Sequence, residues 1–224
     1  MVLFTLYSAS EKNQKIQSDI LALQTRVETI KTFLQKSIYL AGFSGCSKLS
    51  WNEKIIQTDP DPDSEKNSDT LTVIYASSES ELLARDMRGY GVFYLPKTLD
   101  INRGDQLIIS DCQSMEHVTV KKISETRNHQ FKIIPTQLLK HLYSKSAEAH
   151  FYVRDTYFVG KTDHDIDALY WRDRSGEKSE IAENVIDMHV ERSKKMIFLK
   201  FDFETFLFKK TIFVDVGLRN VDET

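Results

Sequence analysis

The chain has 224 residues, enough to bury a sizeable core as one large domain or as a domain joined to a separate helix. Its 30 Lys and Arg residues against 33 Asp and Glu residues give a formal charge of -3. The sequence therefore lacks the basic excess of a nucleic-acid-binding protein and the polybasic run of a segment that binds anionic lipid. The aromatic content of 11% excludes disorder of the whole chain, and only eight glycines argue against phosphate-cradling loops.

Residues 3–42 are predicted to form one long helix. Apolar residues recur every three or four positions, which is the spacing of one helix face. This face consists of Ile16, Ile20, Leu23, Val27, Ile30 and Leu34. Gly42 and Gly45 are expected to end the helix, because glycine adopts positive φ angles at little cost. The half from Val27 onward should lie on the protein's own sheet, whereas the half from Leu3 to Leu23 has nothing of its own to cover it.

Residues 47–70 are predicted to be a loop with an acidic, proline-containing centre. Asp59, Asp61 and Asp63 alternate in it as they do in calcium-binding loops. An EF-hand also needs glycine at position six and glutamate at position twelve, where this chain has Ser64 and Thr70. We interpret the segment as a solvated acidic loop, with a weak cation site as the alternative.

The rest of the chain is predicted to be an antiparallel sheet, because short apolar or alternating runs recur about every ten residues without long helices between them. The expected strands are residues 71–76, 89–94, 106–110, 116–123, 131–134, 149–160, 169–172, 185–190, 196–203 and 211–218. Short helical segments are expected at 77–86 and 137–143. The sequence thus predicts an α+β fold, with a helix of residues 1–45 on a β-rich head of residues 46–224.

Two groups of residues could carry chemistry. Asp163, His164 and Asp165 cluster acids around a histidine, but a polar hairpin loop is the simpler interpretation because no second histidine or nucleophile motif lies nearby. The six histidines are scattered singly, and neither cysteine has a histidine within three residues. We therefore expect no catalytic residues, no metal and no cofactor.

Five phenylalanines crowd one late stretch: Phe198, Phe201, Phe203, Phe206 and Phe208. The simpler interpretation is a core face with a partly covered edge. The functional alternative is an apolar patch or a strand edge offered to a partner subunit.

The oxidation state of Cys46 and Cys112 is undecided at this point. Two free thiols are usual in a cytosolic protein, whereas one disulfide is usual in an exported protein.

A family resemblance arises from the end of the predicted helix. Residues 24–46 resemble the helix of the PilW family, minor pilins of bacterial type IV pili, whose helix ends in Ala-Gly-aromatic-x-Gly-Cys. The matching residues here are Ala41-Gly42-Phe43-Ser44-Gly45-Cys46. Four later blocks resemble family segments in the same order: residues 68–76, 104–112, 181–190 and 216–220. In the third of these, Asn184 stands where glycine is more usual.

The resemblance implies a pilin-like plan, in which the long helix packs on an antiparallel sheet head. It also implies a Cys46–Cys112 disulfide, which would close a loop of about 66 residues and contribute roughly 4 kcal/mol in the chain-entropy account. Phe4-Thr5-Leu6 does not match the start of a mature pilin, because Leu3 and Ser8 replace the required glycine and glutamate. We expect Met1 to Tyr7 to end a longer apolar helix whose leader, processing site and membrane anchor precede this sequence.

The function implied by the resemblance is structural. The precursor would sit in the bacterial inner membrane facing the periplasm, lose its leader to a prepilin peptidase, and enter the extracellular pilus. Its partners would be other minor pilins, the major pilin and a tip adhesin, with no direct contact to nucleic acid. The chain and the other minor pilins would form a complex that primes pilus assembly at or near the fibre tip. The apolar face from Ile16 to Leu34 would be its assembly surface.

Three alternatives remain open at this point. A minor pseudopilin of type II secretion shares the plan of a helix and a sheet. A ligand-binding adhesin could use the loop at Asp163–Asp167 or the aromatic strands to hold a sugar or a surface. A hydrolase built on Asp163, His164 and Asp165 would turn over substrate and lose activity in a His164→Ala variant.

Overall fold

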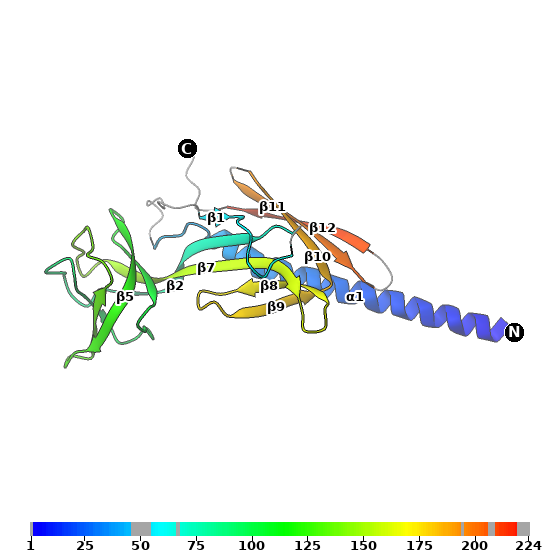
Figure 1. The fold of residues 1–224 in the computed structure, drawn as a ribbon, viewed down its shortest axis with the longest axis horizontal. Coiled ribbons are helices and arrows are strands. Elements are labelled where there is room, and N and C mark those ends of the chain that lie inside the picture. The colour runs from blue at the N-terminus through cyan, green and yellow to red at the C-terminus, as the bar shows by residue number, and fades with distance from the viewer. Residues whose placement is uncertain (1, 46–54, 66–67, 194, 206–208, 219–224) are drawn as a thin grey trace. The chain divides into compact units, whose positions relative to one another are not determined.

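The computed structural model describes residues 2–45, 55–65, 68–193, 195–205 and 209–218, with the backbone alone for residues 2–10. Within these ranges the chain forms one helix, α1 (Val2–Leu40), and twelve strands (Figure 1). The strands are β1 (Ile56–Gln57), β2 (Leu71–Leu82), β3 (Phe93–Pro96), β4 (Gln106–Ser110), β5 (Met115–Glu125), β6 (Gln130–Pro135), β7 (Glu148–Lys161), β8 (Asp167–Arg172), β9 (Lys178–Glu183), β10 (Val185–Arg192), β11 (Met196–Glu204) and β12 (Lys209–Gly217).

The expected α+β, pilin-like class is wrong, because the protein is mainly β. Ladders connect nine strands in the order β1-β2-β7-β4-β5-β6-β3, with β8 beside β7 and β9 beside β8, and β10-β11-β12 form a second sheet. The helix of 39 residues accompanies this large β structure rather than lying on a small head. The expectation failed because several strands are long: β7 has 14 residues, β2 has 12 and β5 has 11.

The chain forms two compact units, and neither is one continuous stretch of sequence. The first unit contains α1 as far as Tyr39, the described residues of Gln57–Thr72, and those of Asp155–Leu218. The second contains the described residues of Leu40–Ile56 together with Val73–Arg154. Strands β2 and β7 each contribute residues to both units, because the unit boundaries fall inside them.

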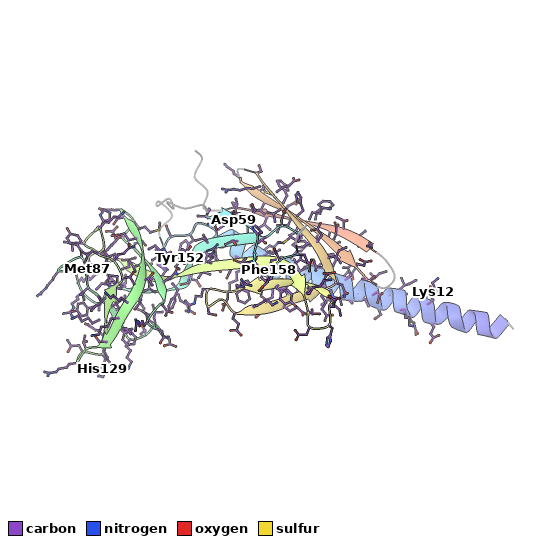
Figure 2. The ribbon with its side chains drawn as sticks, in the orientation of Figure 1. Lys12, Asp59, Met87, His129, Tyr152 and Phe158 are labelled. Carbon is purple, nitrogen blue, oxygen red and sulfur yellow. The ribbon has the colours of Figure 1, made fainter. Side chains whose placement is uncertain are left out.

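The first unit has its core beneath α1 and its late strands. The helix buries Ile30, Leu34 and Ile38, and β11 alternates buried residues with exposed or half-buried ones as a one-sided strand does. Its buried side chains include Phe201 and Phe203. In β7 and β8, Phe158 and Tyr170 stack with ring centroids 5.8 Å apart, and Figure 2 labels Phe158 among these strands.

The second unit has a core of its own, supplied by β3, β4, β5, β6 and the loops between them. It includes the fully buried rings of Phe93 and Tyr143 and the side chains of Leu95, Leu107 and Ile133. Antiparallel ladders join β4 to β5, β5 to β6, and β6 to β3. These pairings are between strands that lie close in sequence, except for β3, which pairs with β6.

Several sequence predictions differ from the observed elements. The predicted loop of residues 47–70 contains β1, and the strand predicted at 89–94 begins at Phe93 instead. Residues 77–82 extend β2 instead of starting a helix, because the Ser77 hydroxyl accepts the Phe151 N–H at 3.1 Å and donates to the Glu79 carbonyl at 2.7 Å. Residues 137–143 form bends rather than a helical turn. Strand β9 was not predicted, since its one buried residue, Ala182, gives no apolar alternation.

Candidate assembly surface

The predicted helix is confirmed, and its apolar face changes environment along its length. Leu23, Ile30 and Leu34 are buried, whereas Ile20 is 41% exposed and Ile16 is half-buried. Leu21, beside this face, is 63% exposed. The remaining side chains of residues 11–22 are exposed or half-buried, and Lys12 marks this part of α1 in Figure 2. The apolar face of α1 therefore continues toward the N-terminus past Leu23, the first of its residues that is buried.

Buried polar contacts fix the other half of the helix. The Ser37 hydroxyl donates to Asp155 Oδ2 at 2.8 Å, and its oxygen lies 2.7 Å from the Tyr157 hydroxyl. All three residues are buried, and burial together with the Asp155 charge raises the pKa of the Tyr157 phenol above its usual range. One turn earlier the Phe33 ring packs on Trp171, with ring centroids 6.1 Å apart. These contacts attach α1 to β7 and β8.

The chain leaves α1 through a closely packed turn. The Gly42 N–H donates to the Ile74 carbonyl at 2.9 Å, and the Phe43 carbonyl accepts the Ala76 N–H at 2.7 Å. Gly45 follows with a φ of +85°, and a Cβ there would lie 2.4 Å from His150 Nε2. The segment after the helix is therefore joined to β2 and held against His150.

The His150 imidazole lies between two acceptors in this region. Its Nδ1 is 2.9 Å from the Ser77 carbonyl and its Nε2 is 3.1 Å from Glu148 Oε2, while the ring itself is buried. The Phe43 ring meets the imidazole edge-on, with centroids 5.9 Å apart. His150 is therefore a buried structural histidine that links β7 to β2 through the Ser77 carbonyl.

Cys112 is disulfide-bonded and has a φ of +64°. Its predicted partner, Cys46, lies outside the described residues, so the pairing stays a prediction. Just before Cys112, the Asp111 carboxylate accepts the N–H groups of Gln113 and Ser114 at 3.0 and 2.8 Å. This turn orders the chain on both sides of Cys112.

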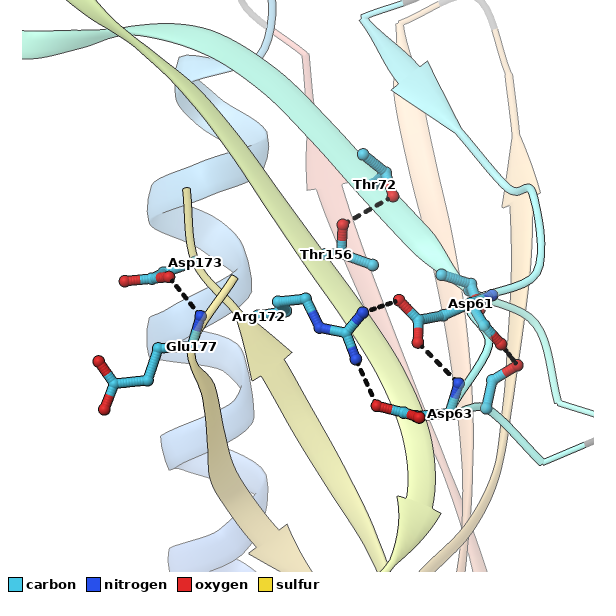
Figure 3. Close-up of polar contacts among 9 residues, drawn as sticks. Asp61, Asp63, Thr72, Thr156, Arg172, Asp173 and Glu177 are labelled. Carbon is cyan, nitrogen blue, oxygen red and sulfur yellow. Dashed lines mark hydrogen bonds and ion pairs between the residues drawn. The ribbon is translucent and has the colours of Figure 1, made fainter. Parts of the chain in front are cut away.

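The acidic loop is largely exposed, as the sequence predicts, but two of its carboxylates bind an arginine. Arg172 on β8 donates through Nη1 to Asp61 at 2.9 Å and through Nη2 to Asp63 at 2.6 Å (Figure 3). The Asp61 side chain is nearly buried, and its other oxygen accepts the Asp63 N–H at 2.9 Å. Asp59 remains exposed. The guanidinium thus bridges the two carboxylates and joins the acidic loop to β8.

The cluster at Asp163–Asp167 is the polar hairpin loop that the sequence predicts. It connects β7 to β8, and Thr162 Oγ1 accepts the N–H groups of His164 and Ile166 at 3.3 and 3.1 Å. His164 is exposed, and the Lys161 ammonium lies 2.7 Å from Asp167 and 3.9 Å from Asp165. The hydrogen bond to Asp167 raises the pKa of Lys161. No group of three potential ligands forms a metal site among the described residues.

A polar pocket of about 710 Å³ lies beside this hairpin, lined by Ser64, Glu65, Ser68, Lys161, Asp167, Ile186 and Asp187. Its lysine is paired with Asp167, and the Ser68 hydroxyl accepts the Met188 N–H of β10 at 2.9 Å.

Asn184, at the turn before β10, has a φ of +63°, which explains why glycine or asparagine suits this position.

The predicted phenylalanine cluster is divided between the core and the surface. Phe201 and Phe203 are buried on the inner face of β11, whereas Phe198 is partly exposed on its outer face. Phe206 and Phe208 lie outside the described residues. Phe213 on β12, which the sequence analysis did not single out, is also exposed on the outer face.

Sequence reasoning missed Ser37, Asp155 and Arg172, which hold this surface in place. Ser37 and Asp155 are 118 positions apart, and Arg172 and Asp61 are 111 apart. A serine within a helix and an arginine at a strand end are common on surfaces, so neither residue type indicates a buried partner. The only usable signal was the run of alternating acids, because a basic side chain is one of the partners that such a run can bind.

Comparison with protein families, curated proteins and solved structures finds no match to this chain. Within the described residues, no helix has both the length and the apolar composition needed to cross a bilayer. The function must therefore be argued from the chain itself.

Proposed function

We propose that this chain is a structural minor pilin that joins other minor pilins to prime assembly of a type IV pilus, near the fibre tip. The observation that carries the proposal is the uncovered apolar face of α1 before Leu23, where Ile20 is exposed, with the exposed Leu21 beside the face. The resemblance of residues 24–46 to the PilW helix supports the same assignment. The inner membrane before assembly and the extracellular pilus afterwards are the locations that go with it.

The proposed mechanism is packing between helices. Covering a large aliphatic side chain contributes about 2 kcal/mol, so Ile16, Ile20 and Leu21 together favour association over exposure to water. Helices that pair through i, i+3 and i+4 positions need only one such face each. The buried contacts of Ser37 keep the remainder of α1 on its own unit, so the uncovered part is presented in one fixed direction.

The three residues of the hydrolase hypothesis, Asp163, His164 and Asp165, are all exposed on the loop between β7 and β8. Asp61 and Asp63 are bound by Arg172, and Asp165 and Asp167 lie against Lys161. His164 is exposed on a hairpin loop, where its N–H bonds to Thr162. This arrangement supports a structural role for the acidic segments over the hydrolase and adhesin alternatives.

The test is the number of surface pili on cells that lack this gene, counted with and without the retraction motor. If the chain primes assembly, pili disappear in the deletion strain and return when retraction is also blocked. Normal pilus numbers in both strains contradict the proposal. A plasmid-borne copy of the gene serves as the control, since it must restore piliation.

A further inference from the structure

Two loop segments of the second unit run side by side and expose apolar residues. They are Asp86–Tyr90 and Leu138–Lys145, called here the double loop. The Leu139 N–H donates to the Tyr90 carbonyl at 2.9 Å, and the Met87 N–H donates to the Tyr143 carbonyl at 2.9 Å. The Lys145 N–H donates to Asp86 Oδ1 at 2.8 Å. These bonds pair the segments in antiparallel order along their length.

The double loop alternates anchors with exposed apolar side chains. Met87, Leu139 and Tyr143 point into the core of the second unit and are buried. Leu138 is 72% exposed, Leu142 is 50% exposed and Tyr90 is 47% exposed. Gly91 lies close to Leu138, since a Cβ there would be 3.2 Å from Leu138 Cδ2, so Leu138 lies next to Tyr90.

Polar contacts fix this conformation without help from the exposed leucines. The Glu116 carboxylate accepts the Lys140 N–H at 2.7 Å and the His141 N–H at 2.9 Å, and the Tyr143 hydroxyl donates to it at 3.3 Å. Burial raises the pKa of the Tyr143 phenol, which therefore stays a donor. Leu138 and Leu142 are thus presented by a loop whose backbone is already ordered, so little entropy is lost when they are covered.

The fold also gathers positive charge that the sequence disperses. Arg88, Lys140 and Lys145 are exposed on the double loop, although they lie up to 57 positions apart in a chain of net charge -3. Asp86 and Glu116 lie beside them and accept backbone N–H groups, but they keep their negative charges, so the three cations leave a positive excess of about one charge. The local surface therefore combines cations with two protruding leucines.

We propose that the double loop binds the surface of a bilayer that contains anionic lipid. Leu138 and Leu142 enter the boundary between headgroups and acyl chains, while Arg88, Lys140 and Lys145 contact the phosphates. A lipid surface fits better than a protein pocket, because leucine is under-represented among the residues that dominate protein interfaces whereas loops with apolar tips and basic flanks suit membranes. This inference does not depend on the pilus assignment.

The test is co-sedimentation of the purified chain with vesicles of phosphatidylcholine containing about one third phosphatidylserine, against phosphatidylcholine alone. Binding is expected to the anionic vesicles, with affinity falling as salt rises from about 0.1 to 1 M. A Leu138→Ser/Leu142→Ser variant and a Lys140→Glu/Lys145→Glu variant should each bind at least about tenfold more weakly. Circular dichroism checks that both variants keep the wild-type fold.

Matched controls separate the double loop from general effects of charge or hydrophobicity. Lys121→Glu/Lys122→Glu reverses two exposed lysines of the same unit on β5, and Phe213→Ser removes an exposed apolar residue of the other unit. Both controls should bind like the wild type. Equal binding to both kinds of vesicle, no binding to either, or equal losses in the controls and the double-loop variants would each overturn the proposal. Capture of an acidic protein without any vesicle binding would point to a protein partner and overturn it as well.

Discussion

At the scale of single residues, the absence of a Cβ at Gly45 allows the chain to pack against His150. A Cβ at Gly45 would meet His150 Nε2 at 2.4 Å and Ser110 Oγ at 2.8 Å, at a φ of +85°. Replacing Gly45 by Ala should therefore lower the free energy of unfolding by more than about 2 kcal/mol, measured by urea denaturation.

The control for this substitution is Gly104→Ala. Gly104 has a φ of +95°, but nothing lies within 4 Å of the position of its Cβ. This variant should lose only the backbone contribution of about 1 kcal/mol. Equal losses for the two variants would show that the clash between the added methyl group and His150 costs no stability.

Arg172 is the second residue whose role was not visible in the sequence. Replacing it by Met keeps the aliphatic stem but leaves the nearly buried Asp61 carboxylate without its counter-charge. We expect a loss of about 3 kcal/mol in the free energy of unfolding, measured in the same way. The exposed Arg127 offers a matched control, since Arg127→Met should change stability by less than about 0.5 kcal/mol. A similar small change at Arg172 would mean that the acidic loop holds its shape without the ion pair.

At the scale of elements, the sequence located α1 well and the strands less well. The 3,4-spacing from Ile16 to Leu34 is a signal that only a helix produces, so its extent could be predicted to within about two residues at each end. Strand β2 was cut short because Ser77, Ser78 and Ser80 look like a helix cap and its first turn. The Ser77 hydroxyl instead accepts the N–H of Phe151 on β7, more than 70 residues away, and local spacing carries no information about such a partner.

The exposed part of α1 supplies the prediction for this element. Ile20→Asp should place a charge in the proposed helix bundle and abolish surface pili, because a charge cannot be buried without a partner. Ser18→Asp puts the same charge on the opposite side of the helix and should leave piliation unchanged. Pilus counts by electron microscopy distinguish the variants. Wild-type piliation in the Ile20→Asp strain would exclude this face from assembly.

The β11–β12 pair makes a prediction about pH. Thr211 donates to Asp202 Oδ1 from the directly opposite position, and Lys200 lies 3.0 Å from Oδ2. The hydrogen bond from Thr211 and then the one from Lys200 lower the pKa of Asp202. A lowered pKa stabilises the fold above the usual carboxyl range of about 4, and this contribution disappears as pH falls through the lowered value.

Thr211→Val keeps the β-branched shape but removes the donor. At pH 7 the variant should therefore be less stable than the wild type by about 1 kcal/mol. In acid, at a pH below the lowered pKa of Asp202, the two proteins should converge, because protonated Asp202 no longer accepts a charge-assisted bond. Urea unfolding at the two pH values provides the measurement. A difference that persists unchanged in acid would assign the effect to packing instead.

At the scale of the whole molecule, the two units differ in how far apart their contacts lie in sequence. The ladders of β4, β5 and β6 join near neighbours, whereas Ser37 on α1 reaches Asp155 across 118 positions and Tyr157 across 120. Local contacts close at a smaller entropic cost, so they are expected to form first. The division of the chain into these units was not predictable from composition, because its boundaries fall inside β2 and β7.

Refolding with the disulfide intact should therefore proceed in a defined order. In pulse-labelled hydrogen exchange, the amides of β4, β5 and β6 should gain protection before those of residues 23–40 in α1. An isolated helix is only marginally stable until its apolar face is covered, so its own hydrogen bonds give little early protection. Protection of α1 ahead of the strands would contradict this order.

The distance between α1 and its covering strands also has a consequence during protein synthesis. The ribosome adds Ser37 to the chain 118 residues before Asp155, and at about 5–20 residues per second this interval lasts roughly 6–24 s. Throughout it, Ile30, Leu34 and Ile38 face water on a nascent chain that cannot yet bury them. A cell that makes this protein has to shield that stripe while translation continues, so the nascent helix is a natural substrate for a chaperone or an export factor.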